Sequence, residues 1–333
     1  MSEPSGRFII SAFGEPDVLQ WQALPELAPQ AGEVAIRHEA IGVNYIDIYH
    51  RKGIYGRPLA LPSGLGVEGA GVVTAVGADV TDFAVGDRVA YVGGAPGAYG
   101  TARCIAAARV VPVPDGVSSQ TAAAVIFKGL TVEYLIRRCR RIGVDDIVLW
   151  HAAAGGVGSL AVQWLAHVGA SVIGTVGSDD KAKRARRLGC TWTINYSNEP
   201  VLERVLEITS GRGVDVVYDS VGQSTIADSI RALRPRGTLV SFGESSGPVA
   251  PIAPATLGAQ GSVYFVRPSI AHYTADRTEL LAAARDVFGM VERGSISVDA
   301  PTVYPLREAA QAQRDLESRK TQGSVILVPE GSG

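Results

Sequence analysis

Residues 151–158 read His-Ala-Ala-Ala-Gly-Gly-Val-Gly, and this stretch decides the fold class of the chain. The apolar run 147–150 (Ile-Val-Leu-Trp) precedes it, and apolar residues at helical spacing follow from Val157 to Val168. A strand, a glycine turn and a helix place backbone N–H groups and a helix N-terminus against a pyrophosphate. The stretch therefore predicts a dinucleotide site, although Ala153 replaces the first glycine of the strict pattern. The alternative is an α/β domain whose glycines serve packing alone.

Predicted strands and helices alternate after this turn. We expect strands at 171–177, 191–196, 214–220 and 237–243, and helices at 179–188, 199–209 and 224–234, the last stopped by Pro235. This alternation is typical of an α/β fold with a doubly wound parallel sheet of the Rossmann type.

The regions on either side of this block have a different pattern. Short β-rich runs separated by turns predict a compact, mostly antiparallel β domain near the N-terminus, with strands at 33–40, 69–76, 88–92 and 98–105. Beyond the block we expect a strand at 261–266, helices near 277–292 and 306–318, and a terminal strand at 324–328 that returns to the first domain. The predicted domains are a substrate domain (1–126), a dinucleotide-binding domain (127–266) and the return to the substrate domain (267–333).

Composition narrows the function classes. A chain of 333 residues fits two domains, and 31 Lys+Arg against 33 Asp+Glu give a net charge of −2, without a global attraction to nucleic acid or membrane. The basic run at 137–141 is expected to end a helix that starts near 129, where the helix dipole favours cations; a polyanion site is the alternative. Without a long apolar window or a signal-like N-terminus, we expect a cytoplasmic protein.

The cysteines and histidines do not form a recognisable constellation. Cys104, Cys139 and Cys190 are far apart and include no Cys-x-x-Cys pair, so the sequence predicts neither a disulfide framework nor a structural zinc site. We expect each cysteine to be a buried small apolar residue. A structural role is also expected for each histidine, namely His38, His50, His151, His167 and His272.

Specific strings along almost the whole chain carry a resemblance to one family. The strings are 44–49 (NYIDIY), 127–131 (FKGLT), 151–158 (HAAAGGVG), 174–177 (GTVG), 194–196 (INY), 218–222 (YDSVG), 241–243 (SFG) and 267–269 (RPS). They resemble the zeta-crystallin-like NADPH:quinone oxidoreductases, the zinc-independent branch of the medium-chain dehydrogenases/reductases. The resemblance implies a GroES-like β domain beside the Rossmann domain, NADPH as cofactor, a quinone as substrate and a homodimer.

The residues also argue against a catalytic metal. Zinc-dependent relatives use a Cys-x-x-Asp segment, a Gly-His-Glu segment and a later ligand. This chain has Asn44 where the thiolate belongs and Val67 where the imidazole belongs, and 124–127 offers no ligand. Neither side chain can replace a zinc donor. The sequence therefore predicts no metal, and it leaves Asp47 and Glu68 to find partners inside the β domain.

The end of the second predicted strand favours NADPH over NADH. The acidic residue that grips a ribose 2′-OH is missing from 175–178 (Thr-Val-Gly-Ser). Asp179 and Asp180 come later, and we favour a capping role for them in the first turn of the next helix. The resemblance implies a site for the NADP 2′-phosphate made by Gly177, Ser178, Lys181 and Tyr196.

Further cofactor contacts are expected from several parts of the chain. The backbone N–H groups of Gly155, Gly156 and Val157 would approach the pyrophosphate. The other predicted contacts come from strand ends, the β domain, the connecting helix and the C-terminal return, namely Ser220, Phe242, Gly243, Ser245, Phe265, Val266, Arg267, Asn44, Tyr49, Lys128, Thr131, Tyr134 and Arg319. Interdomain packing is the alternative role for Lys128, Thr131 and Tyr134.

Hydride transfer is the chemistry of the cofactor, which the protein must orient and desolvate. Without zinc, alcohol oxidation is disfavoured, whereas a quinone is reduced to an aromatic hydroquinone whose oxyanion is delocalised. The candidate catalytic residues are Asn44, Tyr49 and Tyr55, the tyrosines as proton donors or as stacking groups.

Two alternatives stay open: reduction of an enal or enone C=C bond, and an NADPH-binding structural or RNA-binding role. The near-zero net charge argues against RNA binding.

Overall fold

The computed structural model describes residues 5–54, 56, 58–298 and 300–330, and the chain forms two compact units. Unit 1 comprises residues 1–130, 274–293 and 298–333, and unit 2 comprises residues 131–273 and 294–297. The units meet in sequence a few residues after the predicted boundaries at 126/127 and 266/267.

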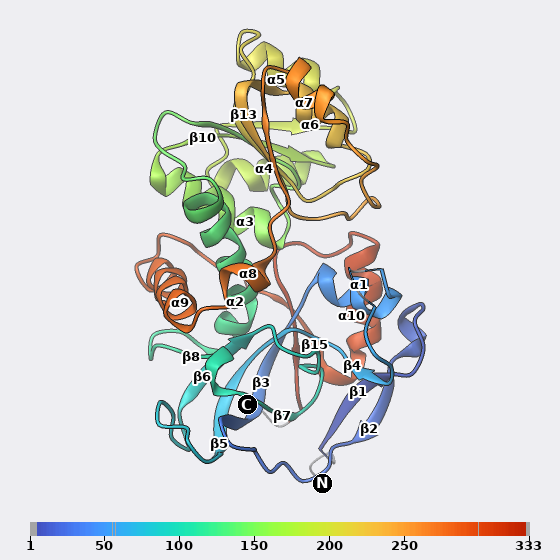
Figure 1. The fold of residues 1–333 in the computed structure, drawn as a ribbon, viewed down its shortest axis with the longest axis vertical. Helices are drawn as coiled ribbons and strands as arrows, with labels where there is room; N and C mark the ends of the chain where they lie inside the picture. The colour runs from blue at the N-terminus through green and yellow to red at the C-terminus, as the bar shows by residue number, and fades with distance from the viewer. Residues whose placement is uncertain (1–4, 55, 57, 299, 331–333) are drawn as a thin grey trace. The chain divides into compact units, whose positions relative to one another are not determined.

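Within the described residues, unit 2 contains a six-stranded parallel sheet (Figure 1). Its strands are β9 (Ile147–Trp150), β10 (Ser171–Val176), β11 (Trp192–Asn195), β12 (Val214–Asp219), β13 (Leu233–Ser241) and β14 (Tyr264–Val266), in the order β11-β10-β9-β12-β13-β14. The strand order reverses between β9 and β12, and open α/β sheets bind ligands at such a point, beyond the carboxyl ends of the strands. The predicted doubly wound Rossmann fold is thus confirmed.

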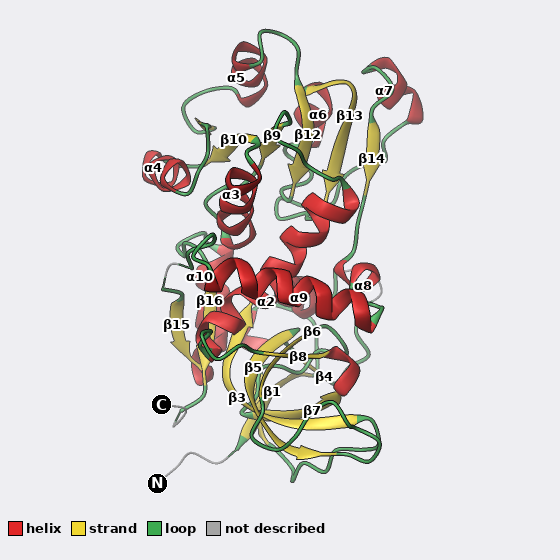
Figure 2. Cartoon of the chain, turned by 90° about the vertical axis from the view of Figure 1, so that its left-hand side faces the viewer, coloured by secondary structure: helices red, strands yellow, loops and turns green. Residues whose placement is uncertain are grey.

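Helices connect these strands (Figure 2). They are α3 (Gly156–Val168), α4 (Asp179–Arg187), α5 (Val201–Ile208), α6 (Ile226–Arg231) and α7 (Pro254–Ala259), and a further helix, α8 (Ile270–Tyr273), follows β14. Leu149, Ile173 and Val217 of the central strands form a buried core with residues of α5 and α6.

The predicted helix 224–234 is wrong at its end. Helix α6 stops at Arg231, and β13 begins at Leu233, so that Pro235 lies inside a strand. The pairing of β12 with β13 shifts register here, since Val214 pairs with Leu233 whereas Val216 pairs with Thr238. A strand tolerates proline at such a bulge, because the ladder is interrupted there.

Unit 1 contains the mostly antiparallel sheets predicted for the β domain, in which β15 and β16 form a parallel pair. The larger sheet has the order β15-β16-β3-β5-β6-β8, with β7 also paired to β3, and a smaller one has the order β2-β1-β4. The strands are β1 (Gly6–Ile10), β2 (Gln20–Ala23), β3 (Glu33–Val43), β4 (Ser63–Gly64), β5 (Glu68–Val76), β6 (Arg88–Val92), β7 (Ala102–Ala106), β8 (Val110–Pro112), β15 (Thr302–Pro305) and β16 (Val325–Val328). Strand β16 pairs antiparallel with the end of β3, Val325 opposite Val43, which confirms the predicted return of the terminal strand.

The larger helices in the unit 1 segments are α1 (Tyr45–Lys52), α2 (Ser119–Glu133), α9 (Arg277–Glu292) and α10 (Ala309–Glu317). Three short 3₁₀ segments are η1 (Pro16–Val18), η2 (Ala107–Arg109) and η4 (Leu306–Glu308). Figure 1 shows α10, in red, beside α1, in blue, although the two helices are far apart in sequence. This arrangement places the C-terminal return directly against the helix that carries Tyr49.

The start of the connecting helix near residue 129 was predicted wrongly. Helix α2 begins at Ser119 and continues as a π-helical segment, η3 (Tyr134–Cys139). Residues 122–126 are buried on every side of the helix, so they show no apolar stripe that would have marked it. The basic run does lie at the end of this helix, since Arg137 and Arg138 belong to the last turn of η3 and Arg140 and Arg141 follow it. Arg138 pairs with Glu133 and Arg140 with Asp146.

Burial of all three cysteines was also predicted wrongly. The thiols are free, but only Cys190 is buried, whereas Cys104 and Cys139 are partly exposed. Cys104 lies on β7, which pairs with β3 along one of its edges. Most residues of β7 are therefore partly exposed. Cys139 lies at the end of η3. Among the described residues, no helix has both the length and the apolar character to cross a bilayer.

Candidate active site

The glycine turn of unit 2 is built as its sequence predicts. Gly155 is the N-cap of α3, and its N–H donates to the carbonyl of Ala152, whose φ of 55° is left-handed. A Cβ on Gly158 would lie 2.3 Å from the Ala152 carbonyl oxygen, so only glycine fits. The first N–H groups of a helix have no partner within it, and α3 therefore directs those of Gly156 and Val157 out of its N-terminus.

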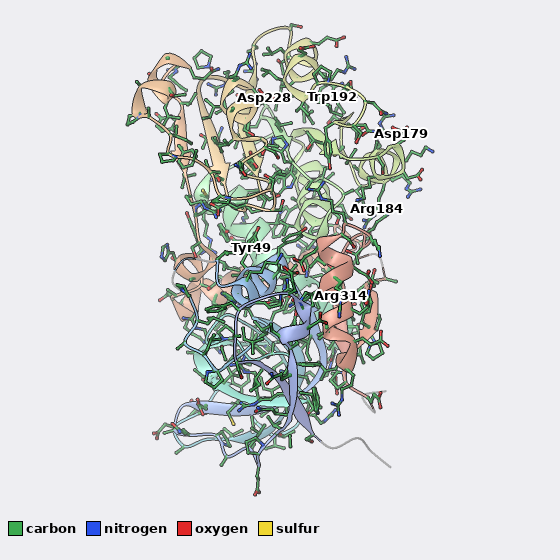
Figure 3. All side chains as sticks on the ribbon, turned by 90° about the vertical axis from the view of Figure 1, so that its right-hand side faces the viewer. Tyr49, Asp179, Arg184, Trp192, Asp228 and Arg314 are labelled. Atoms are coloured by element: carbon green, nitrogen blue, oxygen red, sulfur yellow. The ribbon has the colours of Figure 1, made fainter. Side chains whose placement is uncertain are left out.

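Neighbouring elements hold this turn in place. The N–H groups of Ala153 and His151 donate to the carbonyls of Thr175 and Tyr218, each at 3.1 Å. From α4, the buried Arg184 donates through Nη1 to the Ala154 carbonyl at 3.1 Å (Figure 3). The turn is thus fixed by strands β10 and β12 and by a guanidinium group.

His151 lies in a buried chain of hydrogen bonds below the turn. Ser229 Oγ donates to Asp219 Oδ2 at 2.7 Å and lies 3.0 Å from His151 Nε2. Because Ser229 donates its hydroxyl proton to Asp219, its Oγ can only accept a hydrogen bond from His151. Nε2 of His151 therefore carries the ring proton, and Nδ1 accepts from Thr175 Oγ1 at 3.0 Å. Burial lowers the pKa of His151. These contacts give His151 a structural role.

The predicted phosphate site lies where β10 leads into α4. Ser178 is the N-cap and its Oγ accepts from the N–H of Lys181, whereas Asp179, in the first turn, accepts from Asn195 Nδ2 at 2.7 Å. The serine, and neither aspartate, therefore caps the helix. A Cβ on Gly177 would lie 2.5 Å from Tyr196 Oη, so the tyrosine, 48% exposed, lies over a glycine. An open ring, a hydroxyl and an ammonium in this segment fit an adenosine 2′-phosphate.

The remaining predicted residues of unit 2 gather at strand ends. The N–H groups of Phe242 and Ser245 donate to the carbonyls of Asp219 and Ser220, and a Cβ on Gly243 would lie 2.6 Å from the Ser220 oxygen. These contacts bring the ends of β12 and β13 into close approach at the carboxyl edge of the sheet.

The predicted residues beyond β14 and in the connecting helix make contacts of their own. Arg267 Nη1 donates to the carbonyl of Ser241 at 3.0 Å, and its Nη2 lies 3.3 Å from Glu244 Oε1. Thr131 is buried, and Tyr134, the first residue of η3, stacks on Tyr273 with ring centroids 4.5 Å apart. Phe265 and Val266 belong to the exposed edge strand β14.

A buried polar cluster occupies the unit 1 part of the predicted site. Glu68 Oε1 accepts from Asn44 Nδ2 at 2.6 Å and from Lys128 Nζ at 3.3 Å, and Glu68 Oε2 accepts from the N–H of Phe127 at 2.8 Å. Glu68 has no exposed surface, and Asn44 and Lys128 have almost none. Sequence reasoning placed Asn44 and Lys128 against the cofactor. Here both bind the Glu68 carboxylate, and Asn44 is a partner of Glu68 within the predicted β domain.

Asp47 fixes the backbone of Asn44 from the other side. Its Oδ2 accepts from the Asn44 N–H at 2.9 Å and from Tyr99 Oη at 3.0 Å, and Gln313 Nε2 donates to Tyr99 Oη at 3.3 Å. Burial raises the pKa of Asp47 to about 7, and the nearby Glu68 carboxylate adds to the shift. Asn44 is thereby held at its backbone by Asp47 and at its carboxamide by Glu68.

The other candidates in this unit are less enclosed. Tyr49 is half-buried on α1, with its ring centroid 6.0 Å from that of Tyr45 (Figure 3). Tyr55 lies outside the described residues. Arg319 is exposed just after α10, at a left-handed φ of 59°.

Several positions that build the site were missed by sequence reasoning. A Cβ on Gly42 would lie 1.9 Å from Glu68 Oε1, so this glycine makes the space for the carboxylate. A glycine inside a strand pattern signals such a close approach, and this signal was present. Arg184, Tyr99 and Gln313 carried no local signal, because their partners are distant in sequence.

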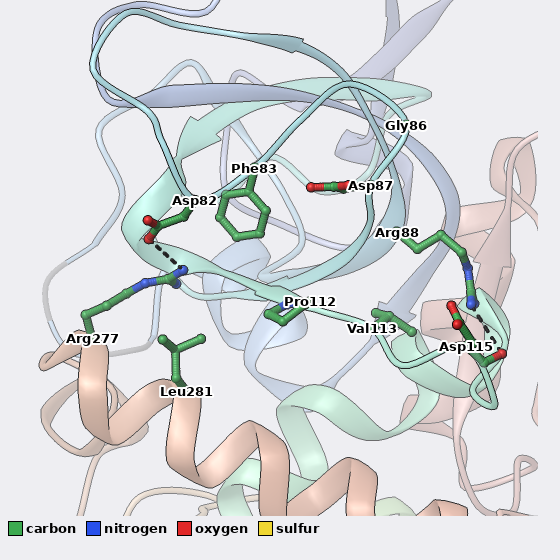
Figure 4. Close-up of a pocket in the computed structure, with 10 residues that line it drawn as sticks. All are labelled: Asp82, Phe83, Gly86, Asp87, Arg88, Pro112, Val113, Asp115, Arg277 and Leu281. Carbon is green, nitrogen blue, oxygen red and sulfur yellow. Dashed lines mark hydrogen bonds and ion pairs between the residues drawn. The ribbon is translucent and has the colours of Figure 1, made fainter.

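Metal donors and pockets complete the description of unit 1. Over the described part of the chain, no group of three or more His, Cys, Asp or Glu side chains could hold a metal ion. A pocket of about 670 Å³ lies between the 82–88 loop, residues 112–115 and α9 (Figure 4). Arg277 spans it toward Asp82 and packs on Phe83. None of the predicted site residues lines this pocket.

Comparisons with known proteins decide the family. A family model described as "Zinc-binding dehydrogenase" matches residues 156–277 of the chain. A second model, described as "Alcohol dehydrogenase GroES-like domain", matches residues 30–115. A quinone oxidoreductase of Pseudomonas aeruginosa is 46% identical, over 97% of this chain and 99% of its own. The chain belongs to the quinone oxidoreductase branch of the medium-chain dehydrogenase/reductase family.

Two further members of this family are informative. The structure of Escherichia coli quinone oxidoreductase complexed with NADPH is 44% identical, with a TM-score of 0.95, over 97% of this chain and 100% of that chain. A 2-haloacrylate reductase of Burkholderia is 42% identical, over 97% of this chain and 98% of its own. The family therefore includes proteins named for quinones and one named for 2-haloacrylate.

Proposed function

We propose that this oxidoreductase reduces quinones with NADPH by hydride transfer and without a metal. The observation that carries the proposal is the Glu68 cluster. A carboxamide and an ammonium satisfy a buried carboxylate in the segments where zinc-dependent relatives place their metal ligands. Family membership and the NADPH complex of the Escherichia coli relative support the choice of cofactor and substrate.

Residues of unit 2 serve the cofactor. Ser178, Lys181 and Tyr196 hold the 2′-phosphate and adenosine, and the N-terminus of α3 holds the pyrophosphate. The other predicted contacts, from the strand ends, β14, Thr131 and Tyr134 of the connecting helix and Arg319, complete the site. When bound, the cofactor supplies a hydride. The overall reaction consumes one quinone, one NADPH and one proton, and yields a hydroquinone and NADP⁺.

Asn44, Tyr49 and Tyr55 position the nicotinamide and the quinone. Because the hydroquinone oxyanion is delocalised, no side chain needs to be an obligatory acid. Removing an obligatory donor costs about 10²–10⁴-fold in rate. We expect Tyr49→Phe and Tyr55→Phe to keep most of the kcat with 1,4-benzoquinone, whereas a drop beyond about a hundredfold would identify a true acid.

Reduction of an activated C=C bond is the second candidate, because the 2-haloacrylate reductase is 42% identical to this chain. An acceptor panel of benzoquinone, naphthoquinone, an alkenal and 2-chloroacrylate, with NADPH consumption as the readout, separates the two. Turnover of quinones supports the proposal. Turnover of the C=C acceptors alone would move the function to the alternative, and RNA binding without NADPH oxidation would favour a non-enzymatic role.

We also propose a homodimer formed by pairing of β14 across a two-fold axis. Tyr264 and Phe265 are 63% and 37% exposed, and β14 is the last strand in the sheet order. An apolar edge strand offers unpaired backbone groups to a second copy. Sedimentation velocity at micromolar concentration should show a dimer that Tyr264→Lys weakens; a stable wild-type monomer would contradict this.

A cytoplasmic location is part of the same proposal. The free thiols Cys104, Cys139 and Cys190 are compatible with a reducing compartment. Fractionation of the source cells with an antibody against the chain tests it.

A further inference from the structure

The buried ammonium group of Lys128 forms an ion pair with the buried carboxylate of Glu68. Its side chain is 5% exposed and that of Glu68 is 0% exposed, with 3.3 Å between Nζ and Oε1. A buried charge is costly unless it is paired and hydrogen-bonded. Glu68 therefore needs a cation, and the helix α2 supplies one together with the N–H of Phe127.

The same carboxylate oxygen holds Asn44. The distance from Asn44 Nδ2 to Glu68 Oε1 is 2.6 Å, the shortest of the three contacts recorded for this carboxylate. A hydrogen bond to a charged acceptor is stronger and more directional than one to a neutral acceptor. The lysine and the asparagine are thus coupled through one atom.

The surroundings leave the Glu68 side chain little freedom. Gly42 of β3 approaches so closely that an added Cβ would overlap the Glu68 carboxylate. Asp47 holds the backbone N–H of Asn44. With both ends of Asn44 fixed, a movement of Glu68 is passed directly to the carboxamide.

We propose that Lys128 is a positioning residue that acts through Glu68 on Asn44, and that it does not bind NADPH directly. This inference rests on the proposed function and deepens it, because it assigns to an internal ammonium the task of holding the Glu68 carboxylate in place against Asn44. The carboxamide of Asn44 is then presented in one orientation to the bound nicotinamide and acceptor.

A charge-balance experiment tests the coupling. Lys128→Met leaves Glu68 without its cation, so the carboxylate shifts and Asn44 loses its orientation. We expect kcat with the acceptor to fall about tenfold to a hundredfold, as for the loss of a charged hydrogen bond. The NADPH Kd should change by less than about threefold, since the phosphate contacts of the cofactor lie in unit 2.

The double variant Lys128→Met, Glu68→Gln should recover most of this loss. A neutral glutamine needs no cation, and its amide oxygen can still accept from Asn44 Nδ2. Its NH2 group then takes the place of Oε2 and cannot accept from the Phe127 N–H, so the recovery stops short of the wild-type kcat. Recovery to within about fivefold of the wild-type kcat supports the proposal. A double variant as slow as the single one, or a tenfold weaker NADPH Kd in Lys128→Met, overturns it.

Two controls keep the outcome interpretable. Lys52→Met removes another lysine–glutamate pair of unit 1, at 2.6 Å from Glu317, and should leave kcat unchanged. Crystal structures of the single and double variants report the Asn44–Glu68 contact without any assay. If the single variant does not fold, retention of that contact in the double variant supports the proposal and its loss overturns it. A wild-type enzyme that reduces no acceptor refutes the proposed function, whereas the crystallographic result still decides the coupling.

Discussion

At the scale of single residues, buried polar partners define this site. Asn44 and Asp47, at the start of α1, bind Glu68, Lys128 and Tyr99 from other parts of the fold, and the group has little access to water. The sequence predicted that Asp47 and Glu68 would find partners in the β domain. It could not name Tyr99, which is 52 residues from Asp47 along the chain.

The raised pKa of Asp47 leads to a prediction of how the stability of the protein depends on pH. Burial raises its pKa from 3.8 to about 7, so the folded protein holds a proton that the unfolded chain releases between these values. The stability contributed by this group is therefore present below about pH 4 and is lost as the pH rises to about 7. An asparagine at this position can keep the acceptor contacts without the charge. We expect Asp47→Asn to destabilise the protein less at pH 8 than at pH 5, by at least about 1 kcal/mol.

Urea unfolding of both proteins at the two pH values measures this difference. The facing groups Glu68, Lys128, Tyr99 and Asn44 are the same in both. Burial lowers the pKa of His38 to about 4, which weakens both proteins equally on acidification and cancels in the comparison. A cost of substitution that is independent of pH would show that Asp47 is ionised throughout.

Two neighbouring lysines test the phosphate site. Lys181 should pair with the 2′-phosphate, so Lys181→Ala should weaken NADPH binding about tenfold to a hundredfold and leave NADH binding unchanged. Lys183, exposed and paired with Asp180 on the same helix, is the matched control. Calorimetric titration of each variant with both cofactors measures the binding affinities. Equal losses of affinity for NADPH and NADH would show that Lys181 does not bind the 2′-phosphate.

At the scale of elements, the sequence predicted local patterns well and missed partners from distant segments. The glycine turn and the order of strands and helices in unit 2 follow from periodicity within short windows. In contrast, β3 was expected to end at residue 40 and continues to Val43, because β16 pairs with residues 41–43. The residues of β3 themselves give no signal that a strand near residue 325 pairs with them.

Strand β3 also provides a prediction. Gly42→Ala places a methyl group 1.9 Å from Glu68 Oε1 and must displace a buried carboxylate, so we expect a loss of about 1–3 kcal/mol in unfolding free energy. Gly258→Ala on α7, with nothing within 4 Å of the added Cβ, should be neutral or stabilising. Denaturant unfolding of both variants gives the comparison, and equal effects would mean that Gly42 does not hold the space for Glu68.

At the scale of the whole molecule, the two units have different structures and, in the proposed function, different roles. Unit 2 has the parallel sheet and glycine turn of a dinucleotide-binding domain, and unit 1 has a polar cluster in which an ammonium and a carboxamide surround a carboxylate. This division explains why the family could be predicted from strings spread over the chain. It also explains why the choice of acceptor could not be predicted, since no single segment defines it.

The central claim is that NADPH reduces a quinone here without a metal. The most direct measurement is NADPH oxidation with 1,4-benzoquinone by protein dialysed against a chelator, with zinc counted by elemental analysis of the same sample. The account predicts full activity with far less than one zinc per chain. About one zinc per chain in the undialysed protein, with activity that is lost on its removal and restored by zinc, would contradict it.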